Sequence, residues 1–311
     1  RAHRNYPAMI AAAAVHPWRW QPHPEVWFLL IALVTLGWYA ARVIGPKVVP
    51  EGEPIITRRQ RGFFIAGLLT LWLAADWPLH DIAEQYLYAL HMIQHFLLAY
   101  VVPPLFLLAT PTWLARLIVG EGRLWRWLKV LAFPVVAAII FNGVVIFTHW
   151  PSVVNLSVAN GIIHYSVHVL VVFSALLMWM PVCGPFPELR MSLPGQMIYL
   201  FAMSIVPTVP AAWLTLGGSV IYDAYDDPQR LWGVSAIGDQ QMAGLIMKLG
   251  GSAYLWGVIT VMFFKWAARH EQAERTGEVL SERDVLTWEH VEAQCDEHPA
   301  ASEPPATPSG R

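Results

Sequence analysis

Two pairs of histidines, His91 with His95 and His164 with His168, are the residues of this sequence best suited to do chemistry. Side chains four residues apart in a helix project from one face, so each pair can offer two imidazole nitrogens to one metal ion. Both pairs lie within long apolar segments. Ionisable side chains at membrane depth cost free energy and usually serve a function. The spacing therefore predicts a metal site inside a membrane protein.

The composition is that of an integral membrane protein. Hydrophobic residues make up 56% of the 311 residues, charged residues make up 14%, and there are 16 tryptophans. A soluble domain of this length would be far less apolar and aromatic. The formal net charge of -2 offers no basic surface for nucleic acid. We therefore expect contact with membrane lipid and none with nucleic acid.

Seven apolar runs are long enough to predict membrane helices. They are continuous rather than alternating, which favours helices over the strands of a barrel. The runs cover residues 27–44, 63–77, 86–108, 128–147, 162–180, 195–213 and 242–266. The predicted fold is an all-α, polytopic membrane protein, a bundle of seven transmembrane helices.

Lysine and arginine gather in the loops on one side of this bundle, which predicts that this side is cytoplasmic. They are Arg42, Lys47, Arg58, Arg59, Arg61, Arg116, Arg123, Arg126, Lys129, Arg190, Lys265 and Arg269. The N-terminus is then outside and the C-terminus cytoplasmic. We expect an extracytoplasmic segment over 1–26, a seven-helix membrane domain over 27–269, and an acidic cytoplasmic tail over 270–311. The tail composition cannot bury a core and predicts disorder over most of it.

With this orientation, both histidine pairs lie in the outer halves of their helices at comparable depth. A further histidine ends the fourth predicted helix, and another lies in the outer loop before the third. The predicted metal ligands are therefore His80, His91, His95, His149, His164 and His168. Both cysteines, Cys183 and Cys295, fall on the predicted cytoplasmic side. An outer site would thus use imidazole, thioether or carboxylate without thiolate.

Four other residues could support these ligands. Asp76 and Asp239 are candidate acceptors that would orient a ligating imidazole, and Met242 and Met247 could complete a soft copper(I) site. Lys248 is the only lysine or arginine buried within a predicted span. It could extend to the interface, pair with a carboxylate such as Asp239, or keep a charge beside the site.

The ligand type leaves several metals and several functions open. Imidazole suits copper, zinc, iron and nickel, and the order of affinities favours copper, here as Cu(I). A zinc-protease motif needs Glu directly after the first His, where this chain has Met92, so no catalytic residue is predicted. Haem b held between imidazoles is one alternative. A copper transporter is another, although no polar residues follow His95 toward the cytoplasm.

Several segments resemble the CtaG family of cytochrome c oxidase assembly factors. The first combines His91, Gln94 and His95 with the later Pro103–Pro104 pair, and the second places His164 and His168 ahead of Met180–Pro181. The third is the Asp239–Gln240–Gln241–Met242 segment. The resemblance covers roughly residues 22 to 268.

This resemblance implies a non-enzymatic assembly factor of the respiratory chain in the bacterial plasma membrane. Such a chaperone would hold copper on the outer membrane face and pass it to a haem-copper oxidase subunit, and a copper donor protein could supply it. Ligating imidazoles must be neutral, so binding is expected to fall below a pH near ~6.5.

Overall fold

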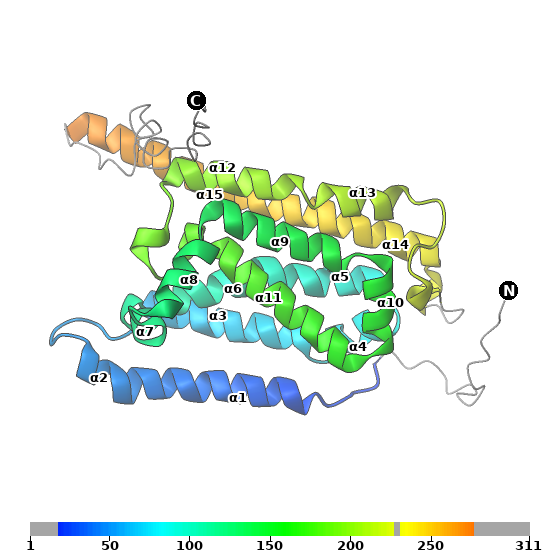
Figure 1. Ribbon diagram of the computed structural model, residues 1–311, viewed down its shortest axis with the longest axis horizontal. Coiled ribbons are helices and arrows are strands. Elements are labelled where there is room, and N and C mark those ends of the chain that lie inside the picture. Colours follow the sequence, from blue (N-terminus) through cyan, green and yellow to red (C-terminus); the bar gives the residue numbers. More distant parts are fainter. Residues whose placement is uncertain (1–17, 227–230, 277–311) are drawn as a thin grey trace, which may run out of the picture.

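Long apolar helices form this computed structural model, which describes residues 18–226 and 231–276. They run side by side along the length of the molecule (Figure 1). Within the described residues, six helical runs are long and apolar enough to cross a membrane: Pro24–Val48, Arg58–Gln85, Tyr88–Ala109, Gly161–Cys183, Leu193–Leu216 and Ala236–Thr276. A seventh is bent by 74° between Arg123–Leu131 and Pro134–Thr148. The prediction of an all-α, polytopic bundle is confirmed, with six spans or seven if the bent pair is one.

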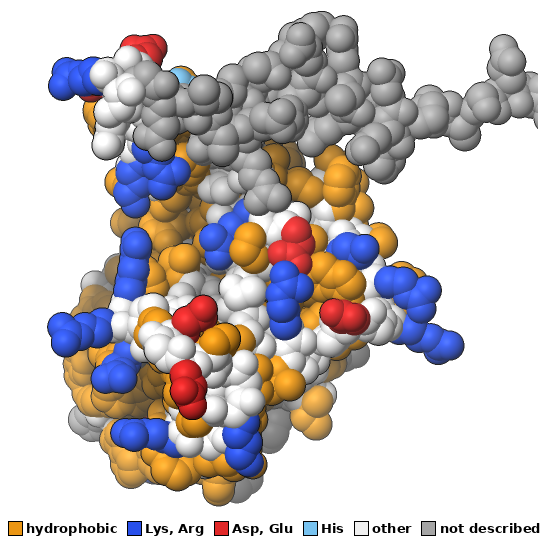
Figure 2. All heavy atoms as spheres, turned by 90° about the vertical axis from the view of Figure 1, so that its left-hand side faces the viewer, with side chains coloured by type: hydrophobic (Ala, Val, Ile, Leu, Met, Phe, Trp, Pro, Cys, Tyr) orange, Lys and Arg blue, Asp and Glu red, His pale blue; other side chains and the backbone are white. Residues whose placement is uncertain are grey.

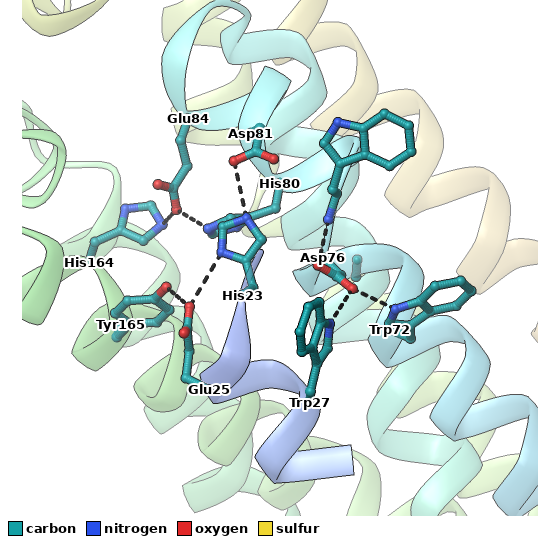
Figure 3. A network of polar contacts seen from close by, with 12 residues as sticks. His23, Glu25, Trp27, Trp72, Asp76, His80, Asp81, Glu84, His164 and Tyr165 are labelled. Carbon is teal, nitrogen blue, oxygen red and sulfur yellow. Dashed lines mark hydrogen bonds and ion pairs between the residues drawn. The ribbon is translucent and has the colours of Figure 1, made fainter. Parts of the chain in front are cut away.

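The first two spans are held together by a buried carboxylate. Span one comprises α1 (Pro24–Tyr39), a π-helical turn η1 (Ala40–Ile44) and α2 (Gly45–Val48), and span two begins with α3 (Arg58–Ala75). Asp76, which ends α3, accepts hydrogen bonds from the indoles of Trp27 at 2.9 Å and Trp72 at 2.6 Å (Figure 3). Its other oxygen accepts from the backbone N–H of Trp77 at 2.9 Å. Asp76 therefore fastens α1 to α3 and bonds to no histidine of the described chain, contrary to its predicted role.

A short helix replaces the predicted loop before the third span. This helix, α4 (Leu79–Gln85), buries His80 and Asp81. His80 was predicted to lie in an outer loop, which is wrong, because the apolar Ile82 and Ala83 of the same turn are buried in the bundle with it. His80 is therefore a fixed, buried side chain.

The third span widens where two prolines interrupt its hydrogen bonds. It consists of α5 (Tyr88–Phe96), the π-helical turn η2 (Leu97–Val101) and α6 (Val102–Ala109). Pro103 has no N–H to donate to the carbonyl of Ala99, four residues earlier. The indole of Trp179 supplies a donor instead, at 3.1 Å from that carbonyl oxygen. The carbonyl that proline leaves without a donor therefore accepts a hydrogen bond that joins the third span to α11 (Gly161–Cys183).

The fourth predicted span is wrong at its start. Residues 128–131 belong to α8 (Arg123–Leu131), a helix none of whose residues is buried, and the apolar helix α9 spans Pro134–Thr148. A residue before proline avoids the helical conformation, and Phe133 is extended with ψ of 130°. The chain therefore bends between α8 and Pro134. The short helix α7 (Thr112–Val119) connects the third span to α8, and α10 (Pro151–Ala159) connects α9 to α11.

The last two spans are broken where Lys248 lies. The first comprises α12 (Leu193–Ile205) and α13 (Thr208–Leu216), and the second comprises α14 (Ala236–Leu245), the π turn η6 (Ile246–Gly250) and α15 (Gly251–Thr276). The 3-10 turn η3 (Pro187–Leu189) precedes them, and the 3-10 turns η4 (Asp223–Tyr225) and η5 (Leu231–Gly233) lie between them. Lys248 donates to the Ser204 carbonyl at 3.1 Å and to the Thr208 hydroxyl at 2.6 Å. The ammonium group therefore bridges the break between α12 and α13, rather than pairing with Asp239 as one alternative held.

Basic side chains gather at one end of the bundle. Figure 2 looks onto the end formed by α2, α7 and α8 and shows lysine and arginine side chains spread over it. The histidine-bearing starts of α5 and α11 lie at the opposite end (Figure 1). The side of the membrane that each end faces stays a prediction. The helix α15 reaches Thr276, past the predicted boundary at 269, and residues 1–17 and 277–311 lie outside the described residues.

Candidate metal centre

Three histidines from two helices meet inside the bundle. The ligand atoms of His91 and His95, from α5, and His168, from α11, all lie within 4.8 Å of one another. Their ring centroids are 4.4 Å apart for His91 and His95, 5.0 Å for His95 and His168, and 5.7 Å for His91 and His168. This three-histidine group could hold a metal ion. The four-residue spacing puts both α5 imidazoles on the face that α11 meets.

One nitrogen of each imidazole in this group has no hydrogen-bond partner in the described part of the chain. His91 Nδ1, His95 Nε2 and His168 Nε2 are buried and lack hydrogen-bond partners among the described residues. A buried polar atom left without a partner costs about 1–3 kcal/mol, so such atoms usually have a ligand. The histidines border a cavity of about 10 Å³, which has room for about one atom of the size of water. A set of neutral imidazoles suits copper, zinc, iron or nickel.

His149 adds a fourth imidazole from another helix. It follows the last residue of α9, and its ring centroid lies 6.3 Å from that of His95. Its Nδ1 lies 2.7 Å from the Val145 carbonyl, which only accepts, so Nδ1 carries the proton. Nε2 then carries no proton and has a free lone pair for a metal, and it is buried without a hydrogen-bond partner among the described residues. Burial lowers the pKa of His149 below its ordinary 6.5. Its tautomer therefore prepares Nε2 for a metal.

His80 and His164 are placed differently from the other four predicted ligands. The Gln94 amide nitrogen donates both to the Ala74 carbonyl and to His80 Nδ1, each at 2.9 Å. His80 Nδ1 must therefore accept, and its protonated Nε2 faces Glu84 Oε1 at 3.1 Å. Both His80 nitrogens are engaged, so His80 is not available as a ligand. His164 stands 4.3 Å from His168 between ring centroids, while its Nε2 lies 2.5 Å from Glu84 Oε1.

Asp239 fixes the helix that carries the first histidine pair. Its carboxylate, 1% exposed in α14, accepts from the backbone N–H groups of Tyr88 at 2.8 Å and Ala89 at 2.9 Å. These groups belong to the first turn of α5, whose N–H groups have no partner within the helix. Asp239 therefore positions His91 and His95 through the backbone rather than by contact with an imidazole.

The two predicted methionines differ in position. Met247 lines an adjoining, mainly apolar cavity of about 50 Å³ together with His95 and His149. Met242 is 52% exposed and lines neither cavity. Met92 lines both cavities, and nothing in the sequence distinguishes it from an ordinary apolar residue of a helix. Soft sulfur atoms thus lie at the border of the site, without forming its centre.

Sequence reasoning missed Glu84 and the role of Gln94. Glu84 follows His80 by four residues, the same spacing that marks the two histidine pairs, so this signal was present in the sequence. Gln94 lies one residue before His95, and its amide nitrogen donates to His80 Nδ1 and so sets the tautomer of His80.

The fold and this site define a class: a multi-pass membrane protein with a buried histidine group that could hold a metal. Residues 47–269 match the family described as cytochrome c oxidase caa3 assembly factor (Caa3_CtaG), and the chain belongs to this family. The match begins after α1, although the resemblance was expected to begin near residue 22. No curated protein and no solved structure matches the chain.

Proposed function

We propose that this protein is a non-enzymatic assembly factor that binds Cu(I) through buried histidines and delivers it to a haem-copper oxidase subunit. The observation that carries the proposal is the group of imidazoles on α5 and α11, whose ligand atoms lie within 4.8 Å of one another and each of which has one buried nitrogen without a partner among the described residues. We assign His91, His95 and His168 as ligands and His149 as a fourth. Family membership supports the oxidase as the destination. Copper is cargo, taken up on the predicted outer face of the bacterial plasma membrane.

The donor set favours copper among the metals that imidazole suits. The group contains no thiolate and no carboxylate, and the thioethers of Met92 and Met247 border its apolar side. Soft sulfur and imidazole donors select Cu(I) over harder ions. The haem alternative is less well supported, because a cavity of about 10 Å³ between the rings has no room for a porphyrin. Release would proceed by exchange of imidazoles for ligands of the receiving subunit.

The test is copper content and visible absorption of the detergent-purified full chain, with and without the double substitution His91→Ala/His95→Ala. We expect about one equivalent of Cu(I) in the unaltered protein, none in the double variant, and no Soret band in either. Cells that carry the double variant should assemble oxidase with less copper. The variant His270→Ala, in the last two turns of α15, is the matched control and should bind copper normally. Full copper binding by the double variant would contradict the proposal.

The affinity for Cu(I) should depend on pH less than it would at an exposed site. Four imidazoles with an ordinary pKa near 6.5 would lose about tenfold in affinity between pH 7.5 and 6.5, because protons compete for each ligand. Burial lowers the pKa of His149, so a smaller fraction of this imidazole is protonated at pH 6.5 and its contribution to the loss is smaller. Equilibrium dialysis at the two pH values measures the loss. A loss of tenfold or more would mean that the ligands titrate as exposed histidines do.

A further inference from the structure

A second polar cluster lies beside the histidine group and includes Glu84 of α4 (Figure 3). One oxygen of Glu84 faces two imidazoles, His80 Nε2 at 3.1 Å and His164 Nε2 at 2.5 Å. The side chain of Glu84 is 31% exposed, whereas that of His164 is 7% exposed and that of His80 is 5% exposed. Among these three side chains, Glu84 is therefore the one that solvent reaches most easily.

The two histidines have different roles around this carboxylate. Gln94 leaves the proton of His80 on Nε2, which lies 3.1 Å from Glu84 Oε1, so His80 places a partial positive charge beside the carboxylate. His164 has no comparable hydrogen bond at Nε2, which is buried and faces Glu84. The two atoms, Glu84 Oε1 and His164 Nε2, come from separate helices and are in direct contact, so a copper ion, which imidazole suits, would have to replace this contact to bind both. Glu84 and His164 thus supply two ligand atoms, and His80 lies beside one of them.

This pair is continuous with the buried group. The His164 ring lies 4.3 Å from that of His168 and 5.6 Å from that of His91, between centroids. An ion held by Glu84 and His164 would be within one ligand exchange of the deeper imidazoles. The path runs from the partly exposed carboxylate, through His164, to histidines whose nitrogens are unpartnered in the described chain.

We propose that Glu84 and His164 form an outer copper station that loads the group of His91, His95 and His168. This inference rests on the proposed function. On binding, a proton on the His164 nitrogen leaves for solvent as the copper–nitrogen bond forms. In the transfer, the bond from copper to the Glu84 oxygen breaks as a bond to His168 Nε2 forms. Copper keeps its oxidation state throughout, so no electron donor or acceptor is needed.

The test is the rate at which the full, detergent-purified protein takes Cu(I) from a coloured Cu(I)–chelator complex after rapid mixing. In Glu84→Gln, which keeps the shape of the side chain, uptake should slow by at least tenfold while the equilibrium affinity changes by less than threefold. Glu84→Asp keeps the charge and should recover part of the rate. The matched control is Glu25→Gln, which changes a carboxylate at the same end of the bundle that bonds Tyr165 rather than Glu84 or His164. Its uptake rate should equal that of the unaltered protein.

The outcomes separate this inference from the proposed function. If the unaltered protein binds no Cu(I) at equilibrium, both are overturned. If it binds Cu(I) and Glu84→Gln takes it up at the same rate, only the outer station is overturned. A folded Glu84→Gln variant that loses equilibrium binding would make Glu84 a ligand of the central site, which also overturns the station. Far-ultraviolet circular dichroism and a melting curve for each variant establish that it is folded.

Discussion

Replacing His168 by leucine should abolish stabilisation by copper and leave the metal-free bundle at least as stable as the unaltered protein. His168 Nε2 is buried without a partner in the described chain, which costs the metal-free fold about 1–3 kcal/mol. Leucine has a similar volume and no polar atom, so it removes this cost without opening a large cavity. An ordinary structural histidine would behave in the opposite way, because its loss would break hydrogen bonds.

The measurement is the melting temperature in detergent with and without Cu(I). A ligand at 100 times its Kd stabilises the folded state by about 2.7 kcal/mol, and His168 is the proposed ligand on α11, whereas His91 and His95 are on α5. The unaltered protein should therefore melt at a higher temperature with copper, and His168→Leu should not. Val169→Leu, at the neighbouring exposed position of α11, is the control and should keep the copper-dependent shift. A metal-free His168→Leu variant that is destabilised by more than about 1 kcal/mol would show a structural role instead.

The helices of this bundle could be predicted because lipid leaves few options for the backbone. Continuous apolar runs predict spans, and the four-residue spacing correctly predicts that His91 and His95 share a face. Pro134 disfavours a helical conformation at Phe133, so a helix break there could have been predicted. The prediction missed it because residues 128–147 are apolar on average. Apolarity also misses α4, because that helix is too short to be a span and its polar residues are typical of a loop.

The supporting residues of the site could not be predicted, because their partners are distant in the chain. Asp76 is a carboxylate at the predicted depth of the histidines, yet it accepts hydrogen bonds from two indoles instead. His80 is close in sequence to the first histidine pair, but Gln94 and Glu84 use both of its nitrogens. Spacing within a helix gives the face of a side chain, whereas the packing of helices decides which neighbour it meets.

The carboxylate of Asp239 should control both the stability of the bundle and the affinity of the metal site. It accepts two backbone N–H groups at the start of α5, from residues 150 or more positions away in the chain. Hydrogen bonds to a charged group contribute about 1.5–3 kcal/mol each, and a negative charge at a helix N-terminus adds about 0.3–1 kcal/mol. The substitution Asp239→Ala should therefore lower the free energy of unfolding by about 3 kcal/mol or more. Both N–H groups would lose this acceptor, and that of Tyr88 is buried.

The same substitution should weaken Cu(I) binding by about 10–100-fold, the usual effect of losing a group that orients a metal ligand. His91 lies within one turn of Tyr88, so a loosened first turn of α5 moves an imidazole of the group directly. Asp239→Asn has one carbonyl oxygen for two N–H groups and should lie between the unaltered protein and Asp239→Ala in both measurements. Asp223→Ala removes an exposed carboxylate from the η4 turn and serves as the control. Copper affinity that stays unchanged while stability falls would mean that the site keeps its geometry without a fixed start of α5.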